Sequence, residues 1–126
     1  MRAGLLAALL LPAPALAEGY DCQLLIACVT ESATCTRTAP EEALTLHLEM
    51  APGSKTATLS SGGDTLDLTL IDTAVTGRSF LARRGGEAIG LLTLRPDGSL
   101  AASSHEMLDG ALVGVTGTGH CLPRNG

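Results

Sequence analysis

Residues 44–50, Leu-Thr-Leu-His-Leu-Glu-Met, alternate apolar and polar side chains without a break. Successive side chains of an extended strand point to opposite faces, so the apolar residues of this stretch are predicted to face a core. Leu44, the first residue of the stretch, is one of the residues predicted to face the core. Residues 65–70, Thr-Leu-Asp-Leu-Thr-Leu, repeat the pattern, and their leucines are also predicted to point inward. A period of two in both stretches favours half-buried β-strands over helices.

Turn signals divide the rest of the chain into further short runs. Glycine, proline and aspartate mark these turns, which are Pro52-Gly53, Gly62-Gly63-Asp64, Gly85-Gly86, Pro96-Asp97-Gly98 and Asp109-Gly110. The spacing predicts about eight strands, near residues 20–28, 43–50, 55–60, 65–72, 78–83, 88–95, 98–104 and 111–117.

The order of these runs predicts how they pair. Strands joined by short turns are antiparallel neighbours, and a meander that curls until its first strand meets its last has no exposed edges. The sequence therefore predicts an all-β fold, a small antiparallel meander that closes into a barrel or a flattened sandwich. Glycines at positions 90, 114, 117 and 119 are expected where such a barrel bends tightly or brings two backbones together.

The N-terminus has the layout of a cleavable signal peptide. Arg2 precedes an apolar run, prolines follow, and small residues stand at the first and third positions before Glu18. Cleavage is therefore predicted after Ala17, which leaves residues 18–126 as a single β domain. The alternative, a membrane anchor, is disfavoured because the apolar run is far shorter than the roughly 20 residues of a spanning helix. The mature protein is expected in the periplasm or secreted, with no membrane anchor.

All four cysteines lie after the predicted cleavage site. An even number of cysteines in a short exported chain indicates disulfides, whereas the same number in the cytosol would suggest metal or redox chemistry. Of the three possible pairings, Cys28 with Cys35 and Cys22 with Cys121 is favoured. The second bond would tie the two ends of the domain and contribute about 4 to 5 kcal/mol on the chain-entropy model. The alternative, Cys22 with Cys35 and Cys28 with Cys121, remains open.

Charge and aromatic content exclude some classes of partner. The chain has 13 acidic residues against 8 Lys and Arg, a formal net charge of -5 at pH 7, and loses one more positive charge with Arg2. A polyanion such as nucleic acid is therefore not expected as a partner. Tyr20 and Phe80 are the only aromatic residues of Phe, Tyr and Trp type. Two rings are too few to build a stacking surface for sugars or for single-stranded nucleic acid.

Catalytic and metal-binding patterns are weak. A hydrolase would have to combine Ser103 or Ser104 with His105, but adjacent residues of a strand point to opposite faces. His47 and Glu49 share one strand face and form the only local pair suited to chelating a metal, while His105, Glu106 and His120 have no recognised ligand spacing. Solvated strand faces commonly carry such residues. No enzyme activity, cofactor or metal is predicted.

One stretch, residues 76–88, combines positive charges with hydroxyl groups and one of the two aromatic rings. Such a patch suits an acidic partner, although solvated rim charges around a glycine hairpin are the simpler explanation. The candidate partner-binding residues are Thr76, Gly77, Arg78, Ser79, Phe80, Arg83 and Arg84.

This stretch resembles the C-type lysozyme inhibitors of bacteria, which include membrane-bound and periplasmic forms. Residues 76–80, Thr-Gly-Arg-Ser-Phe, are similar to the family's Ser-Gly-x-x-Tyr loop, and residues 84–88, Arg-Gly-Gly-Glu-Ala, to its Lys-Gly loop. The spacing between the two motifs is shorter than in the family, and the segment from Cys28 to Cys35 has no counterpart there. The resemblance implies a small exported barrel in which Thr76 hydrogen-bonds inside a lysozyme cleft and Arg84 pairs with a catalytic carboxylate.

Two classes of function follow from the sequence. The first is a non-enzymatic binding or inhibitory domain, with a C-type lysozyme as one expected protein partner. The alternative is a redox or metal-binding periplasmic protein that uses its cysteines or histidines, which requires free and reactive thiols or converging histidines. No feature of the sequence indicates an oligomeric state.

Overall fold

The computed structural model describes residues 18–124, so the predicted signal peptide and the last two residues lie outside the described part. Strands form most of it. They are β1 (Glu18–Val29), β2 (Thr34–Arg37), β3 (Thr45–Met50), β4 (Thr56–Ser61), β5 (Asp64–Ala74), β6 (Gly77–Arg84), β7 (Glu87–Leu94), β8 (Ser99–Leu108) and β9 (Ala111–Pro123). None of the elements in this range is a helix of the length and apolar character needed to cross a bilayer.

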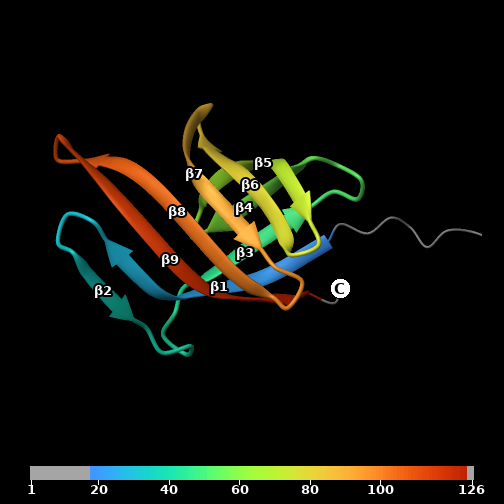
Figure 1. The fold of residues 1–126 in the computed structure, drawn as a ribbon, viewed down its shortest axis with the longest axis horizontal. Coiled ribbons are helices and arrows are strands. Elements are labelled where there is room, and N and C mark those ends of the chain that lie inside the picture. Colours follow the sequence, from blue (N-terminus) through green and yellow to red (C-terminus); the bar gives the residue numbers. More distant parts are fainter. Residues whose placement is uncertain (1–17, 125–126) are drawn as a thin grey trace, which may run out of the picture.

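The strands form a closed antiparallel barrel. From β3 to β9 each strand pairs with the next one in sequence, β3 also pairs with β1, and β9 returns to pair with β1 (Figure 1). Eight strands therefore close the barrel, and β2 is an additional strand attached to β1. The predicted all-β meander and its closure into a barrel are confirmed.

Strand β1 is long enough to pair with two different strands along one of its edges. Residues 18–23 pair with β3, residues 26–29 pair with β2, and β9 pairs along the opposite side of both halves. The β1–β2 and β8–β9 hairpins consequently extend beyond the other strands (Figure 1). We call this the projecting end of the barrel, and the opposite end, where Glu18 and Arg124 lie, the terminal end.

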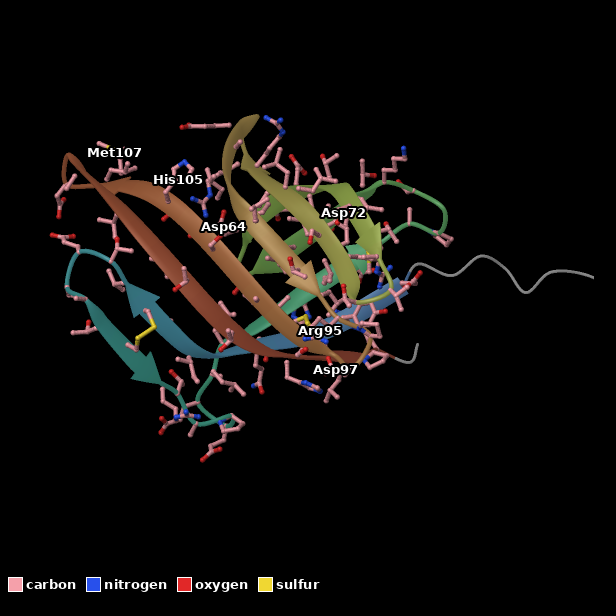
Figure 2. All side chains as sticks on the ribbon, viewed as in Figure 1. Asp64, Asp72, Arg95, Asp97, His105 and Met107 are labelled. Atoms are coloured by element: carbon pink, nitrogen blue, oxygen red, sulfur yellow. A yellow bond between two sulfur atoms is a disulfide. The ribbon has the colours of Figure 1, made fainter. Side chains whose placement is uncertain are left out.

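The turns alternate between these two ends. Figure 2 shows Asp64 and His105 towards the projecting end and Arg95 and Asp97 at the terminal end. In the β7–β8 turn the Asp97 carboxylate accepts a hydrogen bond of 2.8 Å from the backbone N–H of Ser99. The hydrogen bond from the Ser99 hydroxyl, and then this backbone bond, lower the pKa of Asp97 below its ordinary value.

The core fills the middle of the barrel and its terminal end. Phe80, Leu48 and Leu68 are its largest fully buried side chains, and Leu66 and Leu70 pack against it as predicted. The inward direction predicted for Leu44 is wrong, because this residue precedes β3 and its side chain is 67% exposed. The alternating pattern in the sequence therefore begins one residue before the strand β3 that it predicts.

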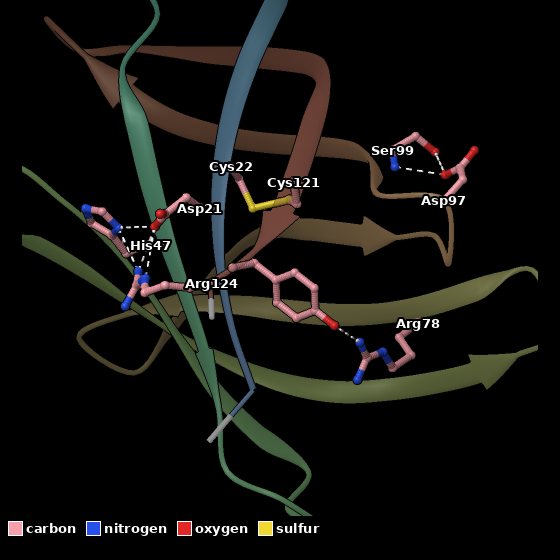
Figure 3. The surroundings of a disulfide bond; sticks show 9 residues. Asp21, Cys22, His47, Arg78, Asp97, Ser99, Cys121 and Arg124 are labelled. Atoms are coloured by element: carbon pink, nitrogen blue, oxygen red, sulfur yellow. Dashed lines mark hydrogen bonds and ion pairs between the residues drawn. A yellow bond between two sulfur atoms is a disulfide. The ribbon is translucent and has the colours of Figure 1, made fainter. Parts of the chain in front are cut away.

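Both disulfides have the predicted pairing. Cys22–Cys121 joins β1 to β9, and its two residues are 0% and 1% exposed (Figure 3). Cys28–Cys35 joins β1 to β2 near the projecting end, where Cys35 is exposed. Each bond links residues that are direct partners in the strand register. Two disulfides in a chain of this size indicate an oxidising compartment.

Two of the glycines expected at close backbone approaches lie where the barrel demands them. A Cβ atom on Gly90 would be 2.0 Å from the carbonyl oxygen of Ser103, and one on Gly119 would be 1.7 Å from that of Gln23. The second site adjoins an irregularity in the β1–β9 register between Leu24 and Ile26. Only glycine fits these approaches without moving a strand.

Candidate functional site

A cavity of about 200 Å³ lies inside the barrel next to the core, towards the projecting end, and is open on one side. Large apolar side chains form most of its wall, and these are Leu24, Leu46, Leu59, Leu66, Ile89, Leu91, Leu92, Leu100 and Val115. Small residues complete the wall, namely Ala27, Ala82, Ala102, Ser103, Ser104 and Gly117. In the middle of the barrel, the inward positions carry leucines and Phe80. Several inward positions near the projecting end carry small residues instead, so the side chains leave this part of the interior unfilled.

Three charged residues form a rim beside the cavity. Arg84 Nη2 lies 3.0 Å from Asp64 Oδ2, and Arg84 Nη1 donates to Glu106 Oε1. Each of the three lies two positions along its strand from a residue that lines the cavity. These pairs are Arg84 and Ala82, Asp64 and Leu66, and Glu106 and Ser104. The hydrogen bond to Glu106, followed by the charges of both carboxylates, raises the pKa of Arg84. The Arg84 side chain thereby links the β6–β7 turn to β5 and to β8.

The wall of the barrel splits beside this rim. The β7–β8 ladder ends at the pair Gly90 and Ser104, although β7 begins at Glu87 and β8 continues to Leu108. We call this split the β7–β8 seam. A groove of about 410 Å³ lies along it, lined by Leu81, Ala88, Gly90, Leu91, Ser103, Ser104 and His105. The groove adjoins the cavity, because the two share lining residues.

Polar groups near the cavity have few protein partners. The Ser61 hydroxyl is buried and has no hydrogen-bond partner within the described residues. It lies on the same face of β4 as the cavity residue Leu59. Ser104, on the inward face of β8, and Ser103 and His105, on the outward face, take part in none of the side-chain hydrogen bonds found within residues 18–124. These groups are available to a ligand.

The residues predicted from the basic stretch are divided between the two ends of the barrel. Thr76 lies in the exposed β5–β6 turn next to Val75, which is 96% exposed. The adjoining Gly77 starts β6. Arg84 lies at the opposite end of β6, whose eight residues span about 25 Å. Thr76 and Arg84, to which the lysozyme-inhibitor resemblance gives roles, are therefore separated by the length of β6.

The other residues of this stretch have structural partners. The Arg78 guanidinium donates to the Tyr20 hydroxyl at 3.3 Å and lies 3.5 Å from Glu18. Ser79 and Thr93 share a hydrogen bond of 2.8 Å between their hydroxyls on neighbouring strands. Arg83 donates to the carbonyl oxygen of Gly86 within the β6–β7 turn. Phe80 is a core residue, only 2% exposed, and its ring therefore contacts the barrel interior and not the solvent.

The pair predicted as the best local chelator, His47 and Glu49, belongs to an ion-pair cluster at the terminal end. Arg124 donates to Glu49 at 2.6 Å. Arg124 also donates to Asp21 at 2.8 Å, and His47 Nδ1 lies 2.8 Å from Asp21 (Figure 3). Hydrogen bonds from Arg124 and then from His47 lower the pKa of Asp21. The cluster ties β1 and β3 to the end of β9. No group of three potential metal ligands occurs within residues 18–124.

The cysteines and the Ser103–His105 run complete the list of predicted sites. All four cysteines lie in the described range and all are in disulfides. Ser103 and His105 share the outward face of β8, yet no hydrogen bond joins their side chains. The cavity and its rim were not predicted from the sequence. A signal for the cavity was present in the small residues at inward positions of β1, β8 and β9, but reading it requires the pairing register.

The chain matches no protein-family model, no curated protein and no solved structure.

Proposed function

We propose that the protein is an exported, non-enzymatic binding domain that holds a small apolar ligand inside its barrel, towards the projecting end. The observation that carries this proposal is the cavity of about 200 Å³ with leucine-rich walls. The two disulfides support export to the periplasm or the medium, because such bonds persist in oxidising compartments.

The size of the cavity limits the size of the ligand. A dry cavity of about 150 Å³ lined by apolar side chains can bind benzene, and the cavity here is about 200 Å³. Pockets for drug-sized molecules are larger, about 300 to 1,000 Å³. The interior therefore suits a small hydrocarbon group, either as a whole ligand or as the end of a longer one.

Binding of toluene to the mature protein tests the proposal. Toluene is expected to raise the melting temperature and to shift the amide NMR signals of cavity residues, because a ligand that binds only the folded state stabilises it. Ala102→Leu places a larger side chain on the inward face of β8 and is expected to abolish both effects. Ala101→Leu, on the exposed outward face of the same strand, is the matched control.

Toluene saturation with the same dissociation constant in the wild type and in Ala102→Leu would contradict the proposal. If Ala102→Leu fails to fold, Ile89→Phe fills the cavity from the adjacent strand and gives the same comparison. Failure of toluene to bind the folded wild type at all would also contradict it.

A C-type lysozyme as a partner is a second candidate, supported by the exposed β5–β6 turn. Val75 at its tip is 96% exposed, and a protruding turn can enter a cleft of a partner protein. Since Arg84 lies at the other end of β6, Thr76 and Arg78 would have to make the contact without it. Titration of the mature protein against a C-type lysozyme tests this candidate, with Thr76→Ala as the variant and Thr58→Ala on β4 as the control. An unchanged lytic rate at saturating protein would contradict it.

A further inference from the structure

The cavity and the groove outside the β7–β8 seam meet at shared residues. Leu91, Ser103 and Ser104 line both. Leu91 and Ser103 are partners in the ladder, one step before its last pair, Gly90 and Ser104. Beyond that pair the two strands continue without pairing. At the seam, the apolar interior and the groove on the solvent side are therefore in contact with the same residues.

Both limits of the seam are fixed by contacts. At one limit, the absence of a side chain on Gly90 lets β7 approach within 2.0 Å, measured from an added Cβ atom, of the Ser103 carbonyl oxygen. At the other limit, Arg84 at the end of β6 binds Glu106 on β8. The opening between these limits is lined by Ala88 and by the serine and histidine side chains of β8. Contacts on both sides therefore bound this unpaired part of the two strands.

The chemistry changes across the seam. Inside it the wall is mainly leucine, whereas the seam itself carries two serine hydroxyls and an imidazole without protein partners among the described residues. The Ser61 hydroxyl, buried on the inward face of β4, is another unpartnered group. At the rim the Arg84 charge already has two carboxylate partners. An anionic ligand would meet those carboxylates, and a cationic one would have to displace Arg84.

We propose that the β7–β8 seam is the entry and the polar half of a single ligand site, and that this site takes an uncharged amphipathic molecule. The apolar end of the ligand occupies the cavity, while a hydroxyl or similar group at its other end hydrogen-bonds Ser104 in the seam. This inference rests on the proposed function and names the class of ligand. Together the cavity and the groove have the size of an ordinary small-molecule site.

A series of 1-alkanols from butanol to nonanol is the probe, with dissociation constants measured by NMR titration of the mature protein. Each added methylene is expected to tighten binding about fourfold. The gain is expected to stop near eight carbons, by proportion to the six carbons of benzene in about 150 Å³. Alkanoates and alkylammonium ions with the preferred chain length are expected to bind at least tenfold more weakly than the alkanol, because the rim charges are already paired.

Ser104→Ala removes the hydroxyl and adds no atoms to the cavity wall. It is expected to weaken binding of the preferred alkanol about 3- to 10-fold, the range of one hydrogen bond, while the dissociation constant of toluene stays unchanged. Thr58→Val, which removes an exposed hydroxyl from β4, is the matched control and is expected to change neither.

The outcomes separate this inference from the proposed function. If toluene binds in the cavity but Ser104→Ala leaves the alkanol affinity unchanged, the seam is not the polar half of the site and the inference is overturned. An alkanoate or alkylammonium ion that binds as well as the alkanol overturns the ligand class. If toluene and the alkanols all fail to bind, both this inference and the proposed function fail.

Discussion

At the scale of single residues, the two ends of the barrel interior differ in the size of their side chains. Phe80, Leu48 and Leu68 fill the middle, while alanine, serine and glycine at inward positions leave space near the projecting end. Because the rest of the interior is closely packed, the cavity depends on the small side chains at these few positions. A single larger residue at one of them is enough to remove it, which is the basis of the Ala102→Leu test.

Gly90 is expected to be the least replaceable residue beside the cavity. In Gly90→Ala the new methyl group would lie 2.0 Å from the Ser103 carbonyl oxygen, so β7 and β8 must separate. A loss of about 1 to 3 kcal/mol in the free energy of unfolding is expected, measured by urea denaturation. Gly114→Ala is the control, since its methyl group would meet only the Thr30 side chain, at 3.2 Å. Equal losses in both variants would contradict this assignment.

The ion-pair cluster around Arg124 is expected to make the free energy of unfolding depend on pH in the acidic range. Asp21 has a pKa below its ordinary value of 3.8 in the folded protein, so its interactions stabilise the fold above the pKa of the unfolded state. That stabilisation is lost as the pH falls through the lowered pKa of the folded state. The wild type is therefore expected to exceed Asp21→Asn in stability at pH 6, with a difference that shrinks below about pH 4. Denaturation at several pH values measures it, with Asp67→Asn as the control, and a constant difference would exclude this role for Asp21.

At the scale of elements, the alternation of residues 44–50 and 65–70 was sufficient to predict β3 and β5, and the glycine turns predicted their antiparallel order. The same reasoning missed β2, because Thr34–Arg37 is only four residues long, fully exposed and without alternation. The cavity was missed for a different reason. It depends on which small residues of distant strands become neighbours, and this follows from register and closure, which local periodicity does not contain.

The Arg84 ion pairs are expected to control the rate of ligand exchange more than the affinity. Arg84 connects the β6–β7 turn to Glu106 on β8 across the seam, and exposed ion pairs contribute only about 0 to 1 kcal/mol. In Glu106→Gln the association and dissociation rate constants for toluene are expected to rise together, within about fivefold, while the dissociation constant stays the same. NMR line shapes measure these rates.

Asp109→Asn, in the β8–β9 turn, is the matched control for that experiment because it removes one acidic charge without touching Arg84. Unchanged exchange rates in Glu106→Gln would show that the ligand does not pass the seam.

At the scale of the whole molecule, closure of the barrel depends on β1 meeting β9, and Cys22–Cys121 lies on that contact. Its sequence separation is 99 residues, against 7 for Cys28–Cys35. The chain-entropy model assigns about 4 to 5 kcal/mol to the longer loop and about 2 to 3 kcal/mol to the shorter one. The sequence alone favoured this pairing, and the strand register explains it, since each cysteine lies directly opposite its partner.

The two disulfides are therefore expected to differ in both stability and accessibility. Replacing Cys22 and Cys121 by alanine is expected to lower the free energy of unfolding by about 2 kcal/mol more than replacing Cys28 and Cys35. With limiting reductant, Cys28–Cys35 is expected to open first, because Cys35 is exposed and the other bond is buried. Alkylation and peptide mass mapping of each step would test the order. Simultaneous opening of both bonds would contradict it.

The pairing of β1 with β9 also places the two ends of the described chain side by side. The Arg124 N–H donates to the Gly19 carbonyl oxygen at 2.7 Å, so a short linker can join these ends, as chain ends that lie close together commonly permit. The exposed β5–β6 turn at Val75 is then a suitable place for the new N-terminus and C-terminus. A circularly permuted chain would keep the same ring of strands, since the neighbours around the barrel, and not the position of the first residue, define this fold.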